Sequence, residues 1–290
     1  MERKKHIFIT GITGNQGSAV AKHLLEQNNS IIGLTRNANS EKAKQWKAKG
    51  ITVIEGNINN PESFESYLDQ AVAVYLVQSL QRKDQEILQG KRFIDAIKSE
   101  NETHLVYASV LGADLETSVP HFESKFELEN YIKSKNLNYS ILRPASFYEN
   151  HLFPRVANDI KKGKYISPLN KMCNQQMIGV DDIGKIAATI FSNKEKYNHK
   201  TISIATDEWQ IGKIPQVFSE AMNKPVSYKK LPGFITRLAM GKDLSKMFKY
   251  MNQNDFSVVN NIHEVRAEFN INGDFRSWVN KNFSPKTINK

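Results

Sequence analysis

The chain has 290 residues, a hydrophobic content of 40% and a formal net charge of +10, which suit one large α/β domain or one such domain with a smaller lobe. Its lysines and arginines are spread along the sequence without a run of five, so the charge favours solubility and attraction for an anionic cofactor over a nucleic-acid partner. The single cysteine, Cys173, excludes an intrachain disulfide framework, and no stretch reaches the roughly 18 apolar residues of a membrane span, so we expect a cytoplasmic protein without a membrane partner.

The first predicted element is an apolar strand from His6 that leads directly into a glycine-rich turn and then an apolar-periodic helix. In such a turn the first glycine makes the bend, the second admits a phosphate close to the backbone, and the third lets the helix pack on the strand. The exposed N–H groups at the start of the helix then face the negative charge. The turn therefore predicts a dinucleotide site, with cofactor-binding residues Gly11, Thr13, Gly14, Asn15, Gln16 and Gly17.

The second predicted strand, Ile31–Thr35, ends at an arginine that indicates which dinucleotide is bound. An NAD site usually has an acid roughly 20 residues beyond the glycines, to bond the ribose 2′-hydroxyl. Here Arg36 stands at that distance, and the first carboxylate is Glu41. Arg36 is either a solvated arginine at a strand end or a bidentate partner for the 2′-phosphate of NADP, and after this turn we expect NADP(H). The following helix carries a solvated face of lysines that would also make this end of the site positive: Lys42, Lys44, Lys47 and Lys49.

Strand and helix signals continue to alternate, which predicts an α/β fold with a Rossmann-type, doubly wound parallel sheet. The further strands are expected at Ile51–Glu55, Ala71–Val77, Leu105–Ala108 and Tyr139–Leu142. Helices are expected from Pro61, over Asp84–Ser99 and from Pro120. Ala71–Val77 is an almost continuous apolar run, as expected of a central strand buried on both faces.

The alternation becomes less regular beyond residue 146. Strands are expected near Met177–Val180, Thr201–Ala205 and Val226–Leu231, and a helix over Asp182–Ser192. These segments predict a seventh strand and a smaller C-terminal α/β substrate lobe. We therefore expect a cofactor-binding domain over residues 1–145, completed by segments near 176–192, and the substrate lobe over residues 146–290.

Candidate site residues follow from the rule that ligands of open α/β sheets lie outside the carboxyl ends of the strands. Ser79 follows the fourth strand, Ser109 the fifth and Pro144 the sixth. On the helix from Pro120, His121 and Lys125 are four residues apart and share a face. Three nearby aromatic and amide residues are expected either to line a pocket for nicotinamide or substrate, or to belong to the core. They are Phe147, Tyr148 and Asn150.

Five segments of the chain resemble the NmrA-like family, an atypical branch of the short-chain dehydrogenase/reductase superfamily. They are residues 10–17 (TGITGNQG), 121–129 (HFESKFELE), 142–150 (LRPASFYEN), 179–184 (GVDDIG) and 273–278 (GDFRSW). The resemblance covers nearly the whole chain and implies NADP(H) binding. It also implies that Asn57 lies where the family contacts adenine and Ser79 in the loop over the cofactor, although both also suit plain turns.

Standard members of the superfamily use a Tyr-x-x-x-Lys pair and a serine, in which the lysine holds the nicotinamide ribose and the tyrosine exchanges a proton with the substrate. By resemblance, Lys125 takes the lysine position, Ser109 the serine position and His121 the tyrosine position. These three are the catalytic candidates, and no metal is expected. Lys125 also suits a solvated helix lysine near Glu129, and Ser109 also suits the cap of a strand end. His121 suits either a general acid near neutral pH or a polar residue of the first helical turn.

Two functions are compatible with this pattern, because the family includes both NADPH-dependent reductases and proteins thought to sense the NADP(H) state. The first is reduction of a quinone or a similar small carbonyl compound, which needs positioning more than a strong acid. The second is a non-catalytic NADP(H) sensor that acts through a regulatory protein partner. A homodimer is compatible with either function.

Overall fold

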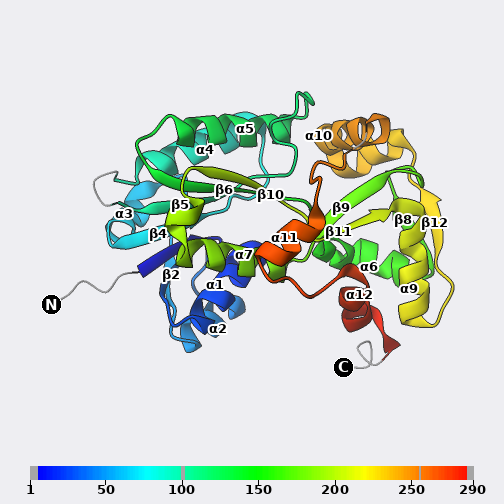
Figure 1. Cartoon of the computed structure of the whole chain (residues 1–290), viewed down its shortest axis with the longest axis horizontal. Coiled ribbons are helices and arrows are strands. Elements are labelled where there is room, and N and C mark those ends of the chain that lie inside the picture. Colours follow the sequence, from blue (N-terminus) through cyan, green and yellow to red (C-terminus); the bar gives the residue numbers. More distant parts are fainter. Residues whose placement is uncertain (1–5, 99–101, 255, 286–290) are drawn as a thin grey trace. The chain divides into compact units, whose positions relative to one another are not determined.

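The computed structural model of the protein describes residues 6–98, 102–254 and 256–285, which form two compact units (Figure 1). The first unit comprises Met1–Asp114, Pro120–Arg143 and Val180–Ile202, and the second comprises Leu115–Val119, Pro144–Gly179 and Ser203–Lys290. From the sequence, we expected a boundary after residue 145 and a returning segment near residues 176–192. In the structure, the segment that returns to the first unit runs over residues 180–202.

The first unit is built on a sheet whose seven strands are arranged in the order β10-β6-β5-β4-β1-β2-β3. The strands are β1 (His6–Thr10), β2 (Ser30–Thr35), β3 (Thr52–Glu55), β4 (Ala71–Leu76), β5 (His104–Ala108), β6 (Asn138–Pro144) and β10 (Lys200–Ile204). Strands β1 to β6 pair in parallel. The His199 N–H donates to the Tyr139 carbonyl oxygen, and the Ala145 N–H donates to the Ile204 carbonyl oxygen. Residue numbers therefore rise in the same direction along both strands, so β10 is also parallel to β6. The predicted doubly wound parallel sheet is therefore confirmed.

Helices cover both faces of this sheet, with α4 and α5 on one face and α1 and α7 on the other (Figure 1). The helices of the unit are α1 (Asn15–Glu26), α2 (Glu41–Ala48), α3 (Glu65–Leu68), α4 (Lys83–Asp95), α5 (Pro120–Lys133), α7 (Val180–Ser192) and α8 (Lys194–Tyr197), with a 3-10 turn η1 (Pro61–Ser63). Under α4, the rings of Phe8, Phe64 and Phe93 pack with centroids 5.4–6.2 Å apart. On the other face, a Cβ added to Gly184 of α7 would lie 2.5 Å from the backbone of Ala19 in α1, so these two helices are in close backbone contact.

Most predicted bounds differ from the observed ones by one or two residues, and two helices and one strand differ by more. The helix expected from Pro61 is a 3-10 turn followed by one short helix. Helix α4 ends at Asp95, and the predicted end at Ser99 lies outside the described residues. The strand expected at Met177–Val180 was placed too late, because β9 is Asn174–Ile178 and Val180 already begins α7. The acids Asp181 and Asp182 stabilise that helix start, since negative charge is favourable at a helix N-terminus.

The second unit has one three-stranded sheet in the order β11-β9-β7 and a two-stranded sheet of β12 and β8. Its strands are β7 (Ser146–Phe147), β8 (Lys164–Ser167), β9 (Asn174–Ile178), β11 (Asp207–Gln210) and β12 (Ser227–Lys230). Its helices are α6 (Pro154–Lys161), α9 (Ile214–Met222), α10 (Gly233–Gln253), α11 (Ile262–Glu268) and α12 (Phe275–Phe283), with 3-10 turns η3 (Tyr148–Leu152) and η4 (Ile211–Lys213). Its core is a cluster of rings around Tyr148, His151, Phe218 and Phe275.

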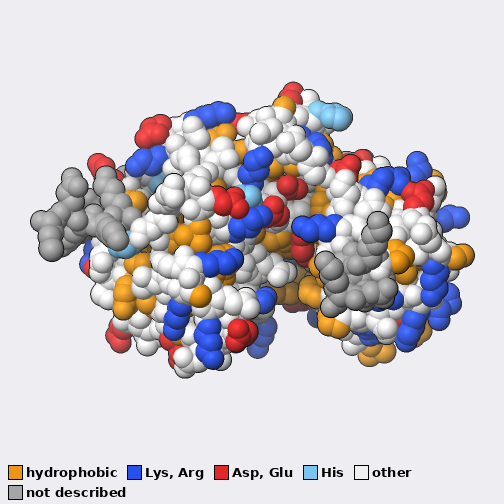
Figure 2. All heavy atoms as spheres, turned by 90° about the horizontal axis from the view of Figure 1, so that it is seen from below, with side chains coloured by type: hydrophobic (Ala, Val, Ile, Leu, Met, Phe, Trp, Pro, Cys, Tyr) orange, Lys and Arg blue, Asp and Glu red, His pale blue; other side chains and the backbone are white. Residues whose placement is uncertain are grey.

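Positive side chains do not form one continuous patch on the face of the first unit that Figure 2 shows. Figure 2 shows lysine and arginine side chains of the first unit interspersed with acidic and uncharged ones. Within residues 6–98, 102–254 and 256–285, no helix is both long enough and apolar enough to cross a membrane.

Candidate cofactor and catalytic site

The turn between β1 and α1 has the tight backbone that its glycines predicted. Gly11 has a φ of +60°, a conformation that side chains disfavour. The Gly14 N–H donates to the Gly11 carbonyl at 2.8 Å and closes the turn. A Cβ on Gly17 would lie 2.3 Å from the Gly11 carbonyl oxygen, so only glycine fits where α1 crosses the turn.

The start of α1 is free to bind an anion. Its N-cap, Gly14, has no side chain that could accept from the first N–H groups, and the first turn of the helix has no acid. The first N–H groups of a helix have no partner within the helix, and they carry its positive dipole end. Gly14 and Asn15 are exposed, whereas the Gln16 Oε1 accepts a hydrogen bond from the Tyr75 hydroxyl at 2.9 Å. An uncapped, exposed helix start of this kind fits a phosphate group.

Two positive residues, Arg36 and Lys42, follow β2, whose last residue contacts this turn. Arg36 is exposed directly after β2 and forms no ion pair within the described part of the chain. The Lys42 Nζ lies 3.4 Å from the Thr13 carbonyl oxygen, so this lysine contacts the turn as well as solvent. The Thr13 and Thr35 hydroxyls are 3.3 Å apart and join the turn to the strand end. The Lys42 ammonium therefore contacts the glycine turn, and Arg36 directly follows Thr35, whose hydroxyl also contacts it.

Asn57 and Ser79 both lie in exposed segments that follow strands. The Asn57 Oδ1 accepts from the Asn59 N–H at 3.0 Å, and the Asn57 N–H donates to the Ser63 hydroxyl at 3.3 Å. Asn57 thus shapes its own turn, whatever else it contacts. Ser79 follows Gln78, whose amide is buried and donates to the Glu86 carbonyl oxygen at 2.9 Å.

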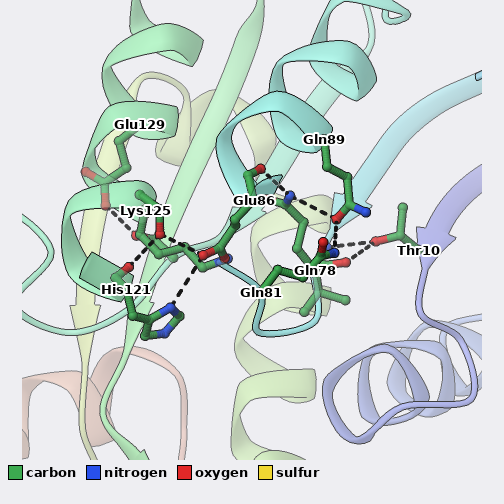
Figure 3. A network of polar contacts seen from close by, with 11 residues as sticks. Thr10, Gln78, Gln81, Glu86, Gln89, His121, Lys125 and Glu129 are labelled. Atoms are coloured by element: carbon green, nitrogen blue, oxygen red, sulfur yellow. Dashed lines mark hydrogen bonds and ion pairs between the residues drawn. The ribbon is translucent and has the colours of Figure 1, made fainter. Parts of the chain in front are cut away.

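The structure brings His121 and Lys125 together around a carboxylate on α4, and Figure 3 shows both side chains pointing toward it. This carboxylate belongs to Glu86, which is completely buried. The Lys125 Nζ lies 2.9 Å from its Oε1, and the His121 Nδ1 lies 3.5 Å from its Oε2. The Ser124 hydroxyl donates to Oε2 at 2.6 Å. One buried anion is therefore shared by both catalytic candidates of α5.

The surroundings of Glu86 keep it ionised. Burial alone would raise its pKa, but His121, the Lys125 charge and the Ser124 hydroxyl together lower the pKa to about 2. The Lys125 Nζ also lies 5.2 Å from the centre of the Tyr107 ring. Burial, together with the neighbouring Glu86, raises the pKa of Tyr107 well above its ordinary value, so this phenol stays neutral. The pair of Glu86 and Lys125 is thus a buried salt bridge with an aromatic wall.

Ser109 lies at a second buried carboxylate. Its hydroxyl donates to the Glu129 Oε1 at 2.6 Å. Arg143, at the end of β6, donates to both oxygens of Glu129, at 2.9 and 2.5 Å, and also pairs with Asp114 at 2.5 Å. The Ser109 hydroxyl is thereby engaged in holding β5 and β6 to α5.

Pro144, the last residue of β6, and Phe147, half-buried in β7, are assigned to the second unit, which begins again at Pro144. Tyr148 is buried and its hydroxyl donates to Asp207, which places it in the core of that unit. Cys173 is half-buried, with its Sγ 3.5 Å from the Asn252 Oδ1. No group of three histidine, cysteine or acidic side chains suited to a metal ion occurs in the part of the chain that the structure describes.

Glu86 and Glu129 were not among the site residues predicted from the sequence. A signal for Glu86 was present, because it stands seven and eight residues before Phe93 and Ile94, on the buried face of the same helix. A carboxylate on the apolar stripe of a helix is rarely buried without a partner. The position of Glu86 on this face therefore indicates a candidate site residue.

Comparison with known proteins agrees with this architecture. The sequence pattern of the NmrA-like family matches residues 3–272. An NmrA-like family domain-containing protein from Dictyostelium discoideum is 26% identical over 294 residues, which cover 91% of this chain and 95% of that protein.

Two solved structures are similar in fold. The NADPH-dependent quinone oxidoreductase of Escherichia coli, in complex with NADPH, matches with a TM-score of 0.81 and 20% identity over 96% of this chain and 100% of its own. NmrA, a negative transcriptional regulator in complex with NADP, matches with a TM-score of 0.79 and 17% identity over 97% of this chain and 96% of its own. With its family pattern matched over nearly its full length, this chain belongs to the NmrA-like family.

Proposed function

We propose that the first unit binds NADP(H). The observation that carries this proposal is the turn at Gly11–Gly17, where a Cβ on Gly17 would collide with backbone and the start of α1 is left uncapped. The pyrophosphate would accept from the N–H groups of Asn15, Gln16 and Gly17. Arg36 would hold the 2′-phosphate, since it is exposed directly after β2 and forms no ion pair in the described residues.

The remaining candidate residues complete this proposed site. Gly14 and Thr13 line the turn, and Lys42 adds positive charge through its contact with the Thr13 carbonyl. Asn57 and Ser79 would contact the cofactor from the exposed segments after β3 and β4. Pro144 and Phe147, which belong to the second unit, stay cofactor-binding predictions from the sequence.

We further propose that the protein is an NADPH-dependent reductase of a quinone or a similar small carbonyl compound. NADPH supplies a hydride when it is bound. His121, with one-fifth of its side chain exposed, is the proposed proton donor to the substrate oxygen. Lys125 holds positive charge beside it, in a salt bridge that fixes its ammonium at Glu86. The similar fold of a quinone oxidoreductase supports this reaction class.

The test is steady-state oxidation of NADPH with a panel of quinones. The wild type should oxidise NADPH, and Gly14→Asp should abolish the reaction, because it places a carboxylate where the pyrophosphate would bind. Gly273→Asp is the matched control, since nothing lies within 4 Å of a Cβ at Gly273. An inert wild type that still binds NADPH would contradict the reductase proposal.

A second candidate function is a non-catalytic NADP(H) sensor with a regulatory protein partner. It is favoured by the state of Lys125, whose side chain is only 5% exposed and is already neutralised by Glu86. A sensor of the redox ratio must bind NADPH and NADP⁺ with different affinities, because equal binding shifts no equilibrium. Equal dissociation constants for the two forms in calorimetry would exclude this role.

A further inference from the structure

We infer that Glu86 is the positioning residue of the site: it turns the Nδ1 of His121 toward the protein and leaves Nε2 as the nitrogen that meets the substrate. This inference rests on the proposed reductase function. It concerns a residue of α4, outside the segments that carry the family resemblance.

The carboxylate of Glu86 is held in one place by contacts to both of its oxygens. Lys125 fixes Oε1 at 2.9 Å and Ser124 fixes Oε2 at 2.6 Å. Its backbone is held as well, because the Gln78 amide donates to the Glu86 carbonyl oxygen at 2.9 Å. Figure 3 shows the chain of contacts from Gln78 through Glu86 to α5. A carboxylate fixed in this way can hold the neighbouring His121 ring in one orientation.

The Nδ1 of His121 faces this fixed anion and not the solvent. It lies 3.5 Å from the Glu86 Oε2, a long contact of the kind that tightens when a ligand binds. An ionised carboxylate only accepts hydrogen bonds, so the nitrogen beside it is favoured to carry a proton. The neutral ring therefore has its N–H at Nδ1, and the proton taken up next goes to Nε2.

This arrangement gives the proposed reaction a defined proton path. Reduction of a quinone to a hydroquinone takes up one hydride, from NADPH, and one proton. The proton leaves a His121 ring that is protonated at both nitrogens: its Nε2–H bond breaks as the O–H bond of the hydroquinone forms. The ring is left with its proton on Nδ1 against Glu86, and Nε2 takes up a new proton from water.

The test compares two carboxylates that join α4 and α5. Glu86→Gln keeps the shape of the side chain and removes its charge. The control is Glu127→Gln, which removes the partner of Lys91 from a surface ion pair of 2.8 Å between the same helices. The ring nitrogens of His121 are read by ¹⁵N NMR and assigned by their loss in His121→Gln.

We expect wild type and Glu127→Gln to have neutral His121 protonated at Nδ1. In Glu86→Gln the Nε2–H form should become a major species, and kcat should fall by roughly 10- to 100-fold, as found for partners that orient metal-bound histidines. An unchanged tautomer in Glu86→Gln overturns the inference, even if that variant is less stable. A shifted tautomer with unchanged kcat also overturns it.

Folding and function are kept apart in this design. If Glu86→Gln does not fold, the double variant Glu86→Gln with Lys125→Met removes both buried charges, and the same change of tautomer is expected. If the wild type oxidises no NADPH with any quinone, the proposed function fails. The tautomer still decides whether Glu86 positions His121.

Discussion

Replacing Gly17 by alanine is expected to disturb the glycine turn and α1 together. The new Cβ would lie 2.3 Å from the carbonyl oxygen and 2.7 Å from the carbonyl carbon of Gly11, and 2.9 Å from the Thr10 oxygen. All three atoms are backbone, so α1 has to move away from β1. Overpacking of this kind lowers the free energy of unfolding by about 1–3 kcal/mol.

The same displacement should weaken cofactor binding. Moving the start of α1 takes its N–H groups out of reach of the proposed pyrophosphate. A hydrogen bond to a charged group contributes about 1.5–3 kcal/mol. Loss of one such bond therefore raises the Kd for NADPH by roughly 10- to 150-fold.

Two measurements check this prediction. Urea unfolding followed by circular dichroism gives the loss of stability, and titration of NADPH fluorescence gives the Kd. Gly273→Ala is the control, because nothing lies within 4 Å of its added Cβ and its φ is not positive. A Gly17→Ala protein with the stability and the Kd of the wild type would refute the role assigned to this contact.

Three further substitutions test other parts of the first unit. Arg36→Ala should raise the Kd for NADPH by roughly 10- to 150-fold and leave that for NADH within about twofold; parallel titrations decide, and equal losses would show that Arg36 does not read the 2′-phosphate. Ser109→Ala should lower the free energy of unfolding by about 1.5–3 kcal/mol, because the Ser109 hydroxyl donates to the buried Glu129. Quinone reduction should persist in this variant, and complete loss of turnover in a folded Ser109→Ala protein would show that Ser109 is catalytic. Burial lowers the pKa of His104 from 6.5 to about 4, so on acidification the imidazole is protonated in the unfolded chain before it is protonated in the folded protein. About 3 kcal/mol of stability is therefore present above pH 6.5 and is lost as the pH falls to 4. His104→Asn should flatten unfolding free energy against pH in that window, and an unchanged slope would contradict the assignment.

Strands β1, β2, β4 and β5 of the first sheet were predictable because each is a largely apolar, buried run. Ala71–Leu76 lies in the middle of the sheet, and its burial on both faces leaves a continuous apolar signal. The strands of the second unit gave a weaker signal. Ser146–Phe147 has two residues, and β8 and β11 have four each, too short for a period of two to be recognised.

The candidate site divides in a similar way. The glycine turn could be predicted because its conformation depends on residues next to one another in sequence. The partner of Lys125 and His121 could not, because Glu86 meets them only when α4 packs on α5. Ser109 was singled out by its place after a strand, but its engagement with Glu129 depends on the packing of α5. The homodimer and the cytoplasmic location stay predictions.

The close contact between α7 and α1 has a consequence for the order in which this protein can fold. Helix α7 and strand β10 come from residues 180–204, so they leave the ribosome long after β1 to β5. Until then, the face of α1 around Ala19 has no helix to cover it, and the open edge of β6 has no neighbour. A nascent chain that stops at residue 145 would therefore expose an uncovered helix and a free strand edge, both sites of aggregation. Folding of the cofactor-binding unit is a late event of synthesis, and truncation before residue 202 should give an unstable product even though the glycine turn is complete.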